Sequence, residues 1–68
     1  MFHSHLTTAL HFYDRGIAAR GLVHVYRALQ VADEQQHEQH AAALVDVKGA
    51  RPADAAAALR AVLAEVDA

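Results

Sequence analysis

The chain of 68 residues contains no cysteine, only one proline and only three glycines. The absence of cysteine excludes disulfide bonds and thiolate metal sites, which support many very small folds. A unit of this size buries only about 60% of the surface that its unfolded chain exposes, so a hydrophobic core alone gives it marginal stability. We therefore expect the chain to associate with itself, most simply as a homodimer.

Long apolar runs and blocks of one charge are also missing. No stretch approaches the roughly 18 apolar residues of a membrane span, and the first five residues lack the basic start and apolar stretch of a signal peptide. These features predict a cytoplasmic protein that makes no membrane contact. The six basic residues are spread along the chain, which argues against a nucleic-acid partner; they are Arg15, Arg20, Arg27, Lys48, Arg51 and Arg60.

Abundant alanine, with apolar residues at intervals of three or four, predicts helices almost throughout. The predicted fold class is all-α, a small helical hairpin bundle of three or four helices. We place these helices near residues 4–15, 18–32, 33–48 and 52–67. Ser4 suits the N-cap of the first helix, Gly16 suits a left-handed turn at its end, and Pro52 suits the first turn of the last helix.

The polar segment that begins at Asp33 leaves two alternatives open. Asp33 and Gln36 have the spacing of a capping box, which would start a third helix and fold the chain into compact hairpins. The segment also contains no helix breaker, so one continuous helix from about 18 to 47 is the alternative. In that case the apolar stripe of the second helix would continue into the third.

Two apolar stripes are the predicted partner-binding surface. Their spacing of three and four residues places the side chains on one face of each helix. Aromatic residues dominate interface hot spots, so Tyr26 is the expected principal contact, although some members of both stripes must form ordinary core. The residues are Leu22, Val25, Tyr26 and Leu29 of the second helix and Leu59, Val62, Leu63 and Val66 of the last.

The opposite side of the second helix carries Arg20, His24 and Arg27. A basic face this short is most simply solvated, and its other uses are contact with phosphate or with an acidic patch on a partner. DNA-binding dimers gather more positive charge than these three positions supply. A small DNA-binding regulator is therefore the least favoured function.

The two halves of the sequence partly repeat. A shift of 33 residues aligns Arg15-Gly16 with Lys48-Gly49, and repeated helix hairpins have periods of about 33 or 34 residues. Through Tyr13, Gly16 and residues 25–29, the first half loosely resembles a degenerate tetratricopeptide repeat. It departs from that family because the spacing from Tyr13 to Gly16 is one residue short and no proline follows the second helix. The resemblance implies a protein-binding scaffold, in which two repeats bury too little core without a partner.

Six histidines are the most unusual feature of the composition. Asp33, His37 and His40 share one face of any helix that runs through them. Imidazole and carboxylate bind zinc and other first-row metals, and Glu34 with His37 has the i, i+3 spacing of di-iron bundles. The simpler explanation is a solvated helix end or a wet patch between subunits. A metal- or pH-responsive protein with a zinc or other divalent site here is our second hypothesis.

No catalytic motif is present. The hydroxyl groups of Ser4, Thr7, Thr8, Tyr13 and Tyr26 lie in no nucleophile motif, and the chain has no glycine-rich phosphate loop. A short helical chain also offers little concave surface for a substrate. We predict a non-enzymatic regulatory or adaptor protein, without a required cofactor, that acts through helix-mediated binding of itself and of another protein.

Overall fold

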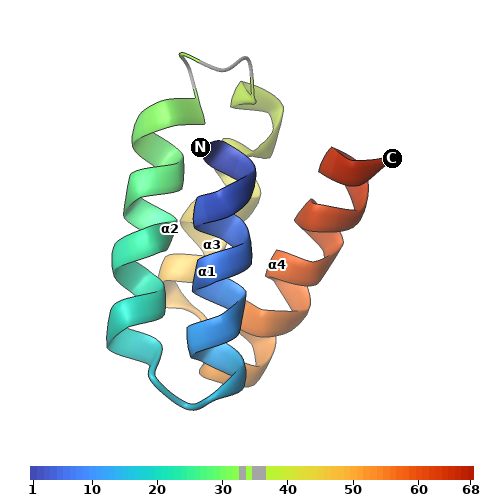
Figure 1. Ribbon diagram of the computed structural model, residues 1–68. Helices are drawn as coiled ribbons and strands as arrows, with labels where there is room; N and C mark the ends of the chain where they lie inside the picture. Colours follow the sequence, from blue (N-terminus) through green and yellow to red (C-terminus); the bar gives the residue numbers. More distant parts are fainter. Residues whose placement is uncertain (33, 35–36) are drawn as a thin grey trace.

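The computed structural model describes residues 1–32, 34 and 37–68, and in these residues the chain is built from helices. The elements are α1 (Phe2–Asp14), α2 (Ala18–Ala32), a 3-10 turn η1 (Glu38–His40), α3 (Ala41–Gly49) and α4 (Pro52–Asp67). Helices α1 and α2 form an antiparallel hairpin, α3 lies behind it, and α4 runs beside α1 and diverges towards the C-terminus (Figure 1). The predicted small all-α bundle is confirmed. Among the described residues, no helix combines the length and hydrophobicity needed to cross a bilayer.

The turn between α1 and α2 has the left-handed glycine expected from the sequence. Gly16 has φ +76°, a conformation that costs glycine little because it has no Cβ. The Gly16 N–H donates to the Tyr13 carbonyl at 3.1 Å, and the Ile17 N–H donates to the Phe12 carbonyl at 2.8 Å. This pair of bonds is the Schellman motif, which satisfies the last carbonyls of α1 and reverses the chain.

The start of α1 differs from the prediction. The helix begins at Phe2, so the expected N-cap at Ser4 is wrong; Ser4 lies inside the first turn and its Oγ donates to the Met1 carbonyl at 3.0 Å. Thr7 and Thr8 likewise donate to carbonyls of the preceding turn, at 2.9 and 2.8 Å. Burial of the Phe2 ring against the core explains why the helix extends to the terminus.

The continuous helix from 18 to 47 is wrong. Helix α2 ends at Ala32, and α3 begins only at Ala41 and packs against α2. The His37 N–H donates to the Ala32 carbonyl at 2.7 Å across the reversal. The proposed capping box of Asp33 and Gln36 lies outside the described residues. The reversal buries Leu44 and Val47 in the core, whereas a single rod would leave them without a facing helix.

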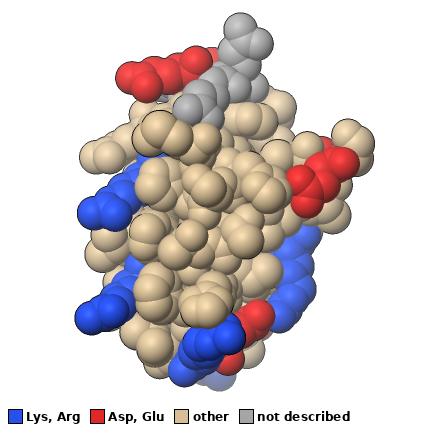
Figure 2. All heavy atoms as spheres, viewed as in Figure 1, with Lys and Arg blue, Asp and Glu red and all other residues tan. Residues whose placement is uncertain are grey.

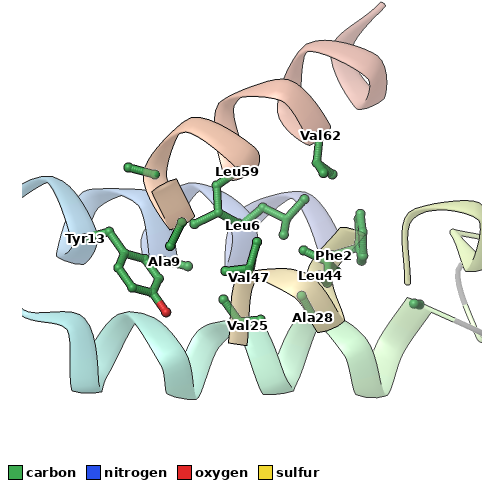
Figure 3. Close-up of a cluster of buried hydrophobic side chains, with 13 residues drawn as sticks. Phe2, Leu6, Ala9, Tyr13, Val25, Ala28, Leu44, Val47, Leu59 and Val62 are labelled. Atoms are coloured by element: carbon green, nitrogen blue, oxygen red, sulfur yellow. The ribbon is translucent and has the colours of Figure 1, made fainter. Parts of the chain in front are cut away.

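Side chains from all four helices form one core (Figure 3). Helix α1 lies centrally and contacts both α2 and α4, while α3 closes the core from behind. The radius of gyration is 10.4 Å, close to the ~11 Å expected for a folded chain of this length. The buried apolar residues are Phe2, Leu6, Ala9, Tyr13, Val25, Ala28, Ala32, Leu44, Val47, Ala55, Ala56, Leu59 and Val62.

Helix α2 turns a different face to the core from the one predicted. At about 100° per residue the buried face is rotated by roughly 80° from the predicted stripe, so small residues lie inside. A Cβ on Gly21 would lie 2.8 Å from Cδ2 of Tyr13 and 3.1 Å from the Ala9 carbonyl oxygen, which shows how closely α1 and α2 approach. This rotation leaves Tyr26 on the surface. The buried residues of α2 are Gly21, Val25, Ala28 and Ala32.

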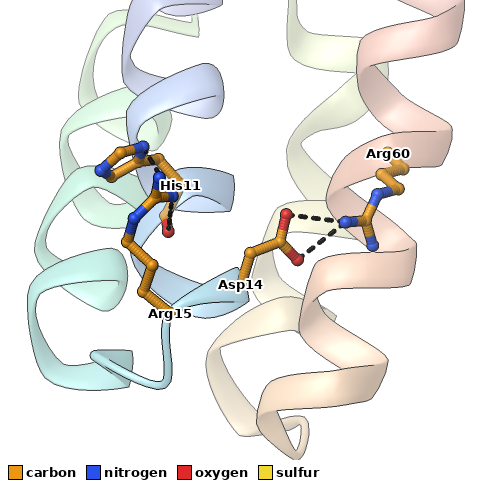
Figure 4. A network of polar contacts seen from close by, with 4 residues as sticks. All are labelled: His11, Asp14, Arg15 and Arg60. Carbon is orange, nitrogen blue, oxygen red and sulfur yellow. Dashed lines mark hydrogen bonds and ion pairs between the residues drawn. The ribbon is translucent and has the colours of Figure 1, made fainter.

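Polar contacts between exposed side chains join α4 to α1. Nη2 of Arg60 donates to both carboxylate oxygens of Asp14 at 2.7 Å (Figure 4). Nearer the other end of α1, Nε2 of His3 lies 2.9 Å from Oδ1 of Asp67. From Phe2 to Tyr13, α1 has no lysine, arginine, aspartate or glutamate, and the middle of the face in Figure 2 is free of these side chains.

Candidate functional site

Three large apolar side chains of α2 and α3 are exposed. Val23 and Tyr26, one turn apart on α2, are 46% and 48% exposed, and Val45 of α3 is 51% exposed. Tyr26 reaches α3 through Lys48, whose Nζ lies 4.8 Å from the centroid of the tyrosine ring. Val45 lies one turn before Lys48 on the same side of α3. We name Val23, Tyr26 and Val45, with the charged residues that border them, the α2 surface.

The border of the α2 surface is positively charged. Arg20 and Arg27 are exposed and lie three residues before and four residues after Val23, which places them beside it on α2. Lys48 adds a third positive charge from α3. Between Ala18 and Ala32 the helix has no aspartate or glutamate. Single exposed apolar residues are normal, whereas a group with a polar border is typical of a binding surface.

The structure divides the eight predicted partner-binding residues between core and surface. Val25, Leu59 and Val62 are buried in one copy of the chain, so a partner cannot contact them while the chain is folded. Leu29, Leu63 and Val66 are partly buried and pack against the same core. Leu22 is half-buried. Of the eight predicted residues, Tyr26 alone has an exposed side chain.

Val23 and Val45 were missed by the sequence analysis. Both lie off the apolar stripes from which the partner-binding surface was predicted. The available signal was that Val23 is an apolar residue on the side of α2 that carries Arg20 and Arg27. An apolar side chain within a basic face is exposed in any packing that buries the opposite face.

The residues predicted to bind metal have other contacts. Asp33 lies outside the described residues. The His37 ring stacks on Phe2 with centroids 4.2 Å apart, and its buried Nδ1 has no hydrogen-bond partner within the described chain. His40 is buried, with its Nδ1 3.3 Å from Oε2 of Glu65. The described residues contain no group of three His, Cys, Asp or Glu side chains arranged to hold a metal ion. Both histidines join η1 to neighbouring helices.

A second pair of histidines joins α1 to α2. Nδ1 of His5 lies 3.2 Å from Nδ1 of His24, and the ring centroids are 5.5 Å apart. Phe12 stacks on His24 at 5.8 Å between centroids. Burial lowers the pKa of His5, and the positive charges of His24, Arg27 and the amino terminus lower it further. His5 is therefore mainly neutral at pH 7, where one Nδ1–H can donate to the other ring nitrogen.

The serine and threonine hydroxyl groups of α1 that the sequence offered as candidates are bonded to nearby backbone carbonyls. The Ser4, Thr7 and Thr8 hydroxyls each donate to a carbonyl of α1 or of the residue before it. Nη1 of Arg15 and Nδ1 of His11 lie 2.9 Å apart on the exposed side of α1 (Figure 4). The described residues enclose no pocket.

Comparison with protein-family models, with curated proteins and with solved structures found no match to this chain. The likeness to a tetratricopeptide repeat therefore depends only on the residues quoted above. The two glycines that the internal repeat aligns also differ in backbone conformation. Gly16 has a positive φ, whereas Gly49 ends α3 without one.

Proposed function

We propose that this chain is a small non-enzymatic regulatory or adaptor protein of the cytoplasm that binds another protein on the α2 surface. The observation that carries the proposal is the exposure of Val23, Tyr26 and Val45, of which Tyr26 is joined through Lys48 to the turn of α3 that carries Val45. Tyrosine and arginine are also the side chains most enriched in binding hot spots. Fractionation of the native host tests the cytoplasmic location.

The charges around the α2 surface favour an acidic, amphipathic helix as the partner segment. Such a helix would place apolar side chains against Val23, Tyr26 and Val45, as helices do when they bind in apolar grooves. Its acidic side chains would then meet Arg20 and Arg27, which have no carboxylate on their own helix. Complementary charge of this kind raises the association rate and selects among partners.

The α2 surface could also be occupied by a second copy of the chain, which would make a homodimer. A symmetric contact through α2 would bring Arg20 and Arg27 of both copies into one interface without an acid on either helix to balance them. This repulsion favours a different protein over a second copy as the occupant of the α2 surface. Light scattering coupled to size exclusion measures the oligomeric state directly.

The experiment compares three forms of the full chain as bait in the native host: wild type, the double variant Val23→Glu, Tyr26→Ala, and the control Ile17→Ser. Ile17 is 42% exposed but lies outside the α2 surface, so its variant changes exposed apolar area elsewhere. Circular dichroism first confirms that all three are folded. A protein that binds wild type and control is then purified, and its affinity for each form is measured.

We expect the double variant to weaken binding at least tenfold, because truncation of a hot-spot tyrosine typically costs about 2 kcal/mol. Replacement of Arg20 and Arg27 by glutamine should slow association and reduce its dependence on salt. Equal affinity of the double variant and wild type would disprove the proposal. If the affinity did not change with salt, the proposed apolar contact would stand, but the proposed acidic partner would be disproved.

A further inference from the structure

His5 and His24 have no part in the proposed function, and they bring two imidazole nitrogens together between helices. We propose that His5 and His24 form an interhelical site for one divalent transition metal ion of the Zn²⁺, Ni²⁺ and Cu²⁺ class. The site uses none of the residues from which the sequence predicted metal binding. Its ligand atoms are Nδ1 of His5 on α1 and Nδ1 of His24 on α2, 3.2 Å apart.

The distance between these nitrogens suits a metal ion. Zinc–imidazole bonds of about 2.0–2.1 Å at a tetrahedral angle place two ligand nitrogens about 3.3–3.4 Å apart. The observed separation of 3.2 Å is within ~0.2 Å of that value. A metal ion can therefore replace the proton shared between the rings if both rings turn. Ring centroids 5.5 Å apart place the two nitrogens almost on the line between the rings, and an ion at bonding distance from both nitrogens lies off that line.

The two rings are held by packed helices and not by a loop. Phe12 stacks on His24 with an interplanar angle of 18°, which fixes the plane of that imidazole. In the same hairpin, Gly21 allows α2 to approach the Tyr13 ring and the Ala9 carbonyl closely. Ligands on rigid elements with packed side chains lose less freedom when a metal binds.

Protons compete with a metal ion for the two rings. Metal binds neutral imidazole, so metal affinity should fall as the pH is lowered. In the metal-bound form each ring carries its proton on Nε2. The proton that lay between the two Nδ1 atoms therefore moves through solvent to Nε2 of its own ring, and two neutral rings release no net proton. Arg27 and the amino terminus lie close enough to affect His5 and repel a cation, so they weaken binding without removing a ligand.

The coordination sphere is open. No third His, Cys, Asp or Glu of the described chain joins the pair, so water fills the other positions. With imidazole as the only protein ligand, affinity should follow the order Cu²⁺ above Ni²⁺ and Zn²⁺, with Mg²⁺ and Ca²⁺ unbound because they prefer oxygen. A metal in this position would tie α1 to α2 and stabilise the folded chain by mass action.

The first test is thermal unfolding of the metal-stripped full chain during titration with Ni²⁺ or Zn²⁺. We expect the melting temperature to rise by several degrees and to saturate at one ion per chain, and Mg²⁺ to have no effect. His5→Gln and His24→Gln should each abolish the rise. The matched control His11→Gln, an exposed histidine of α1 that contacts Arg15, should keep it. A rise retained in both His5→Gln and His24→Gln would overturn the site.

The second test locates the ion without relying on a variant. Substoichiometric Cu²⁺ broadens the nuclear magnetic resonance signals of residues near it, and we expect the loss to centre on His5, His24 and Phe12. Broadening centred on His37 and His40, on His3, or on His11 would mean that the ion binds elsewhere and would overturn the proposal. An absence of broadening at one equivalent would overturn it as well.

Discussion

Gly21 shows how one residue sets the distance between two helices. A Cβ at this position would lie 2.8 Å from the Tyr13 ring and 3.1 Å from a backbone oxygen of α1, and neither neighbour can move freely in the core. Overpacking of this kind costs typically 1–3 kcal/mol, while alanine gains about 1 kcal/mol of helix propensity. We expect Gly21→Ala to lower the free energy of unfolding by about 1 kcal/mol, measured by urea denaturation.

The control is Gly49→Ala at the end of α3. A Cβ there meets nothing within 4 Å, so only the propensity term applies. We expect this variant to be as stable as wild type or more stable, by up to about 1 kcal/mol. A stabilised Gly21→Ala would show that α1 and α2 are separated more widely than described.

Burial of Tyr13 should make the stability of the folded chain depend on pH in the alkaline range. Burial raises the pKa of its phenol, while in the unfolded chain the phenol ionises near pH 10. Above pH 10 the unfolded state therefore binds fewer protons than the folded state, and stability falls as the pH rises. Urea denaturation between pH 9 and 11 should show this loss, and Tyr13→Phe should show a smaller one. An equal slope in Tyr13→Phe would assign the effect to other groups.

At the scale of the element, burial holds α4 in place more than its ion pairs do. Leu59 is buried, and removing its side chain should cost about 2–5 kcal/mol because a cavity remains. The neighbouring Arg60 pairs with Asp14, but their side chains are 57% and 39% exposed, and such pairs contribute about 0–1 kcal/mol. We expect Leu59→Ala to unfold much of the population and Arg60→Gln to change stability little, as measured by urea denaturation. Similar losses in both would contradict this assignment.

The helices that could be predicted from the sequence are those with strong local signals. Pro52 and the glycine turn at Gly16 fixed the start of α4 and the end of the first hairpin helix, and α2 has the predicted span. The segment after Ala32 could not be decided because no local residue forces a break. The reversal there is favoured by the burial of Leu44 and Val47 against other helices, which is a non-local effect.

The face that α2 buries could not be read from hydrophobic periodicity either. Periodicity follows the large residues, whereas α2 packs through Gly21, Ala28 and Ala32 because small side chains let α1 come close. This rotation places Tyr26 on the surface, as the candidate site requires. It also explains why Val25 was assigned to a partner when it belongs to the core.

At the scale of the whole molecule, the chain completes its core in one copy. Among the described residues, thirteen buried apolar side chains from four helices form a single cluster, so the exposed residues of the α2 surface are not needed to close it. We therefore expect association to be added to a folded chain, and we expect folding not to depend on it. The expectation that a single copy is only marginally stable, and therefore associates, stays a prediction.

Val23 and Val25 lie two residues apart on different faces of α2, so matched substitutions at these positions test whether folding depends on association. Val25→Glu places a carboxylate in the core without a partner and should unfold the chain, because a buried unpaired charge costs several kcal/mol. Val23→Glu places the same side chain in solvent between Arg20 and Arg27 and should change the free energy of unfolding by no more than about 0.5 kcal/mol. Circular dichroism during urea denaturation, at several protein concentrations, measures both. If Val23→Glu also unfolded the chain, and wild-type stability rose with concentration, the α2 surface would be an obligate interface between copies.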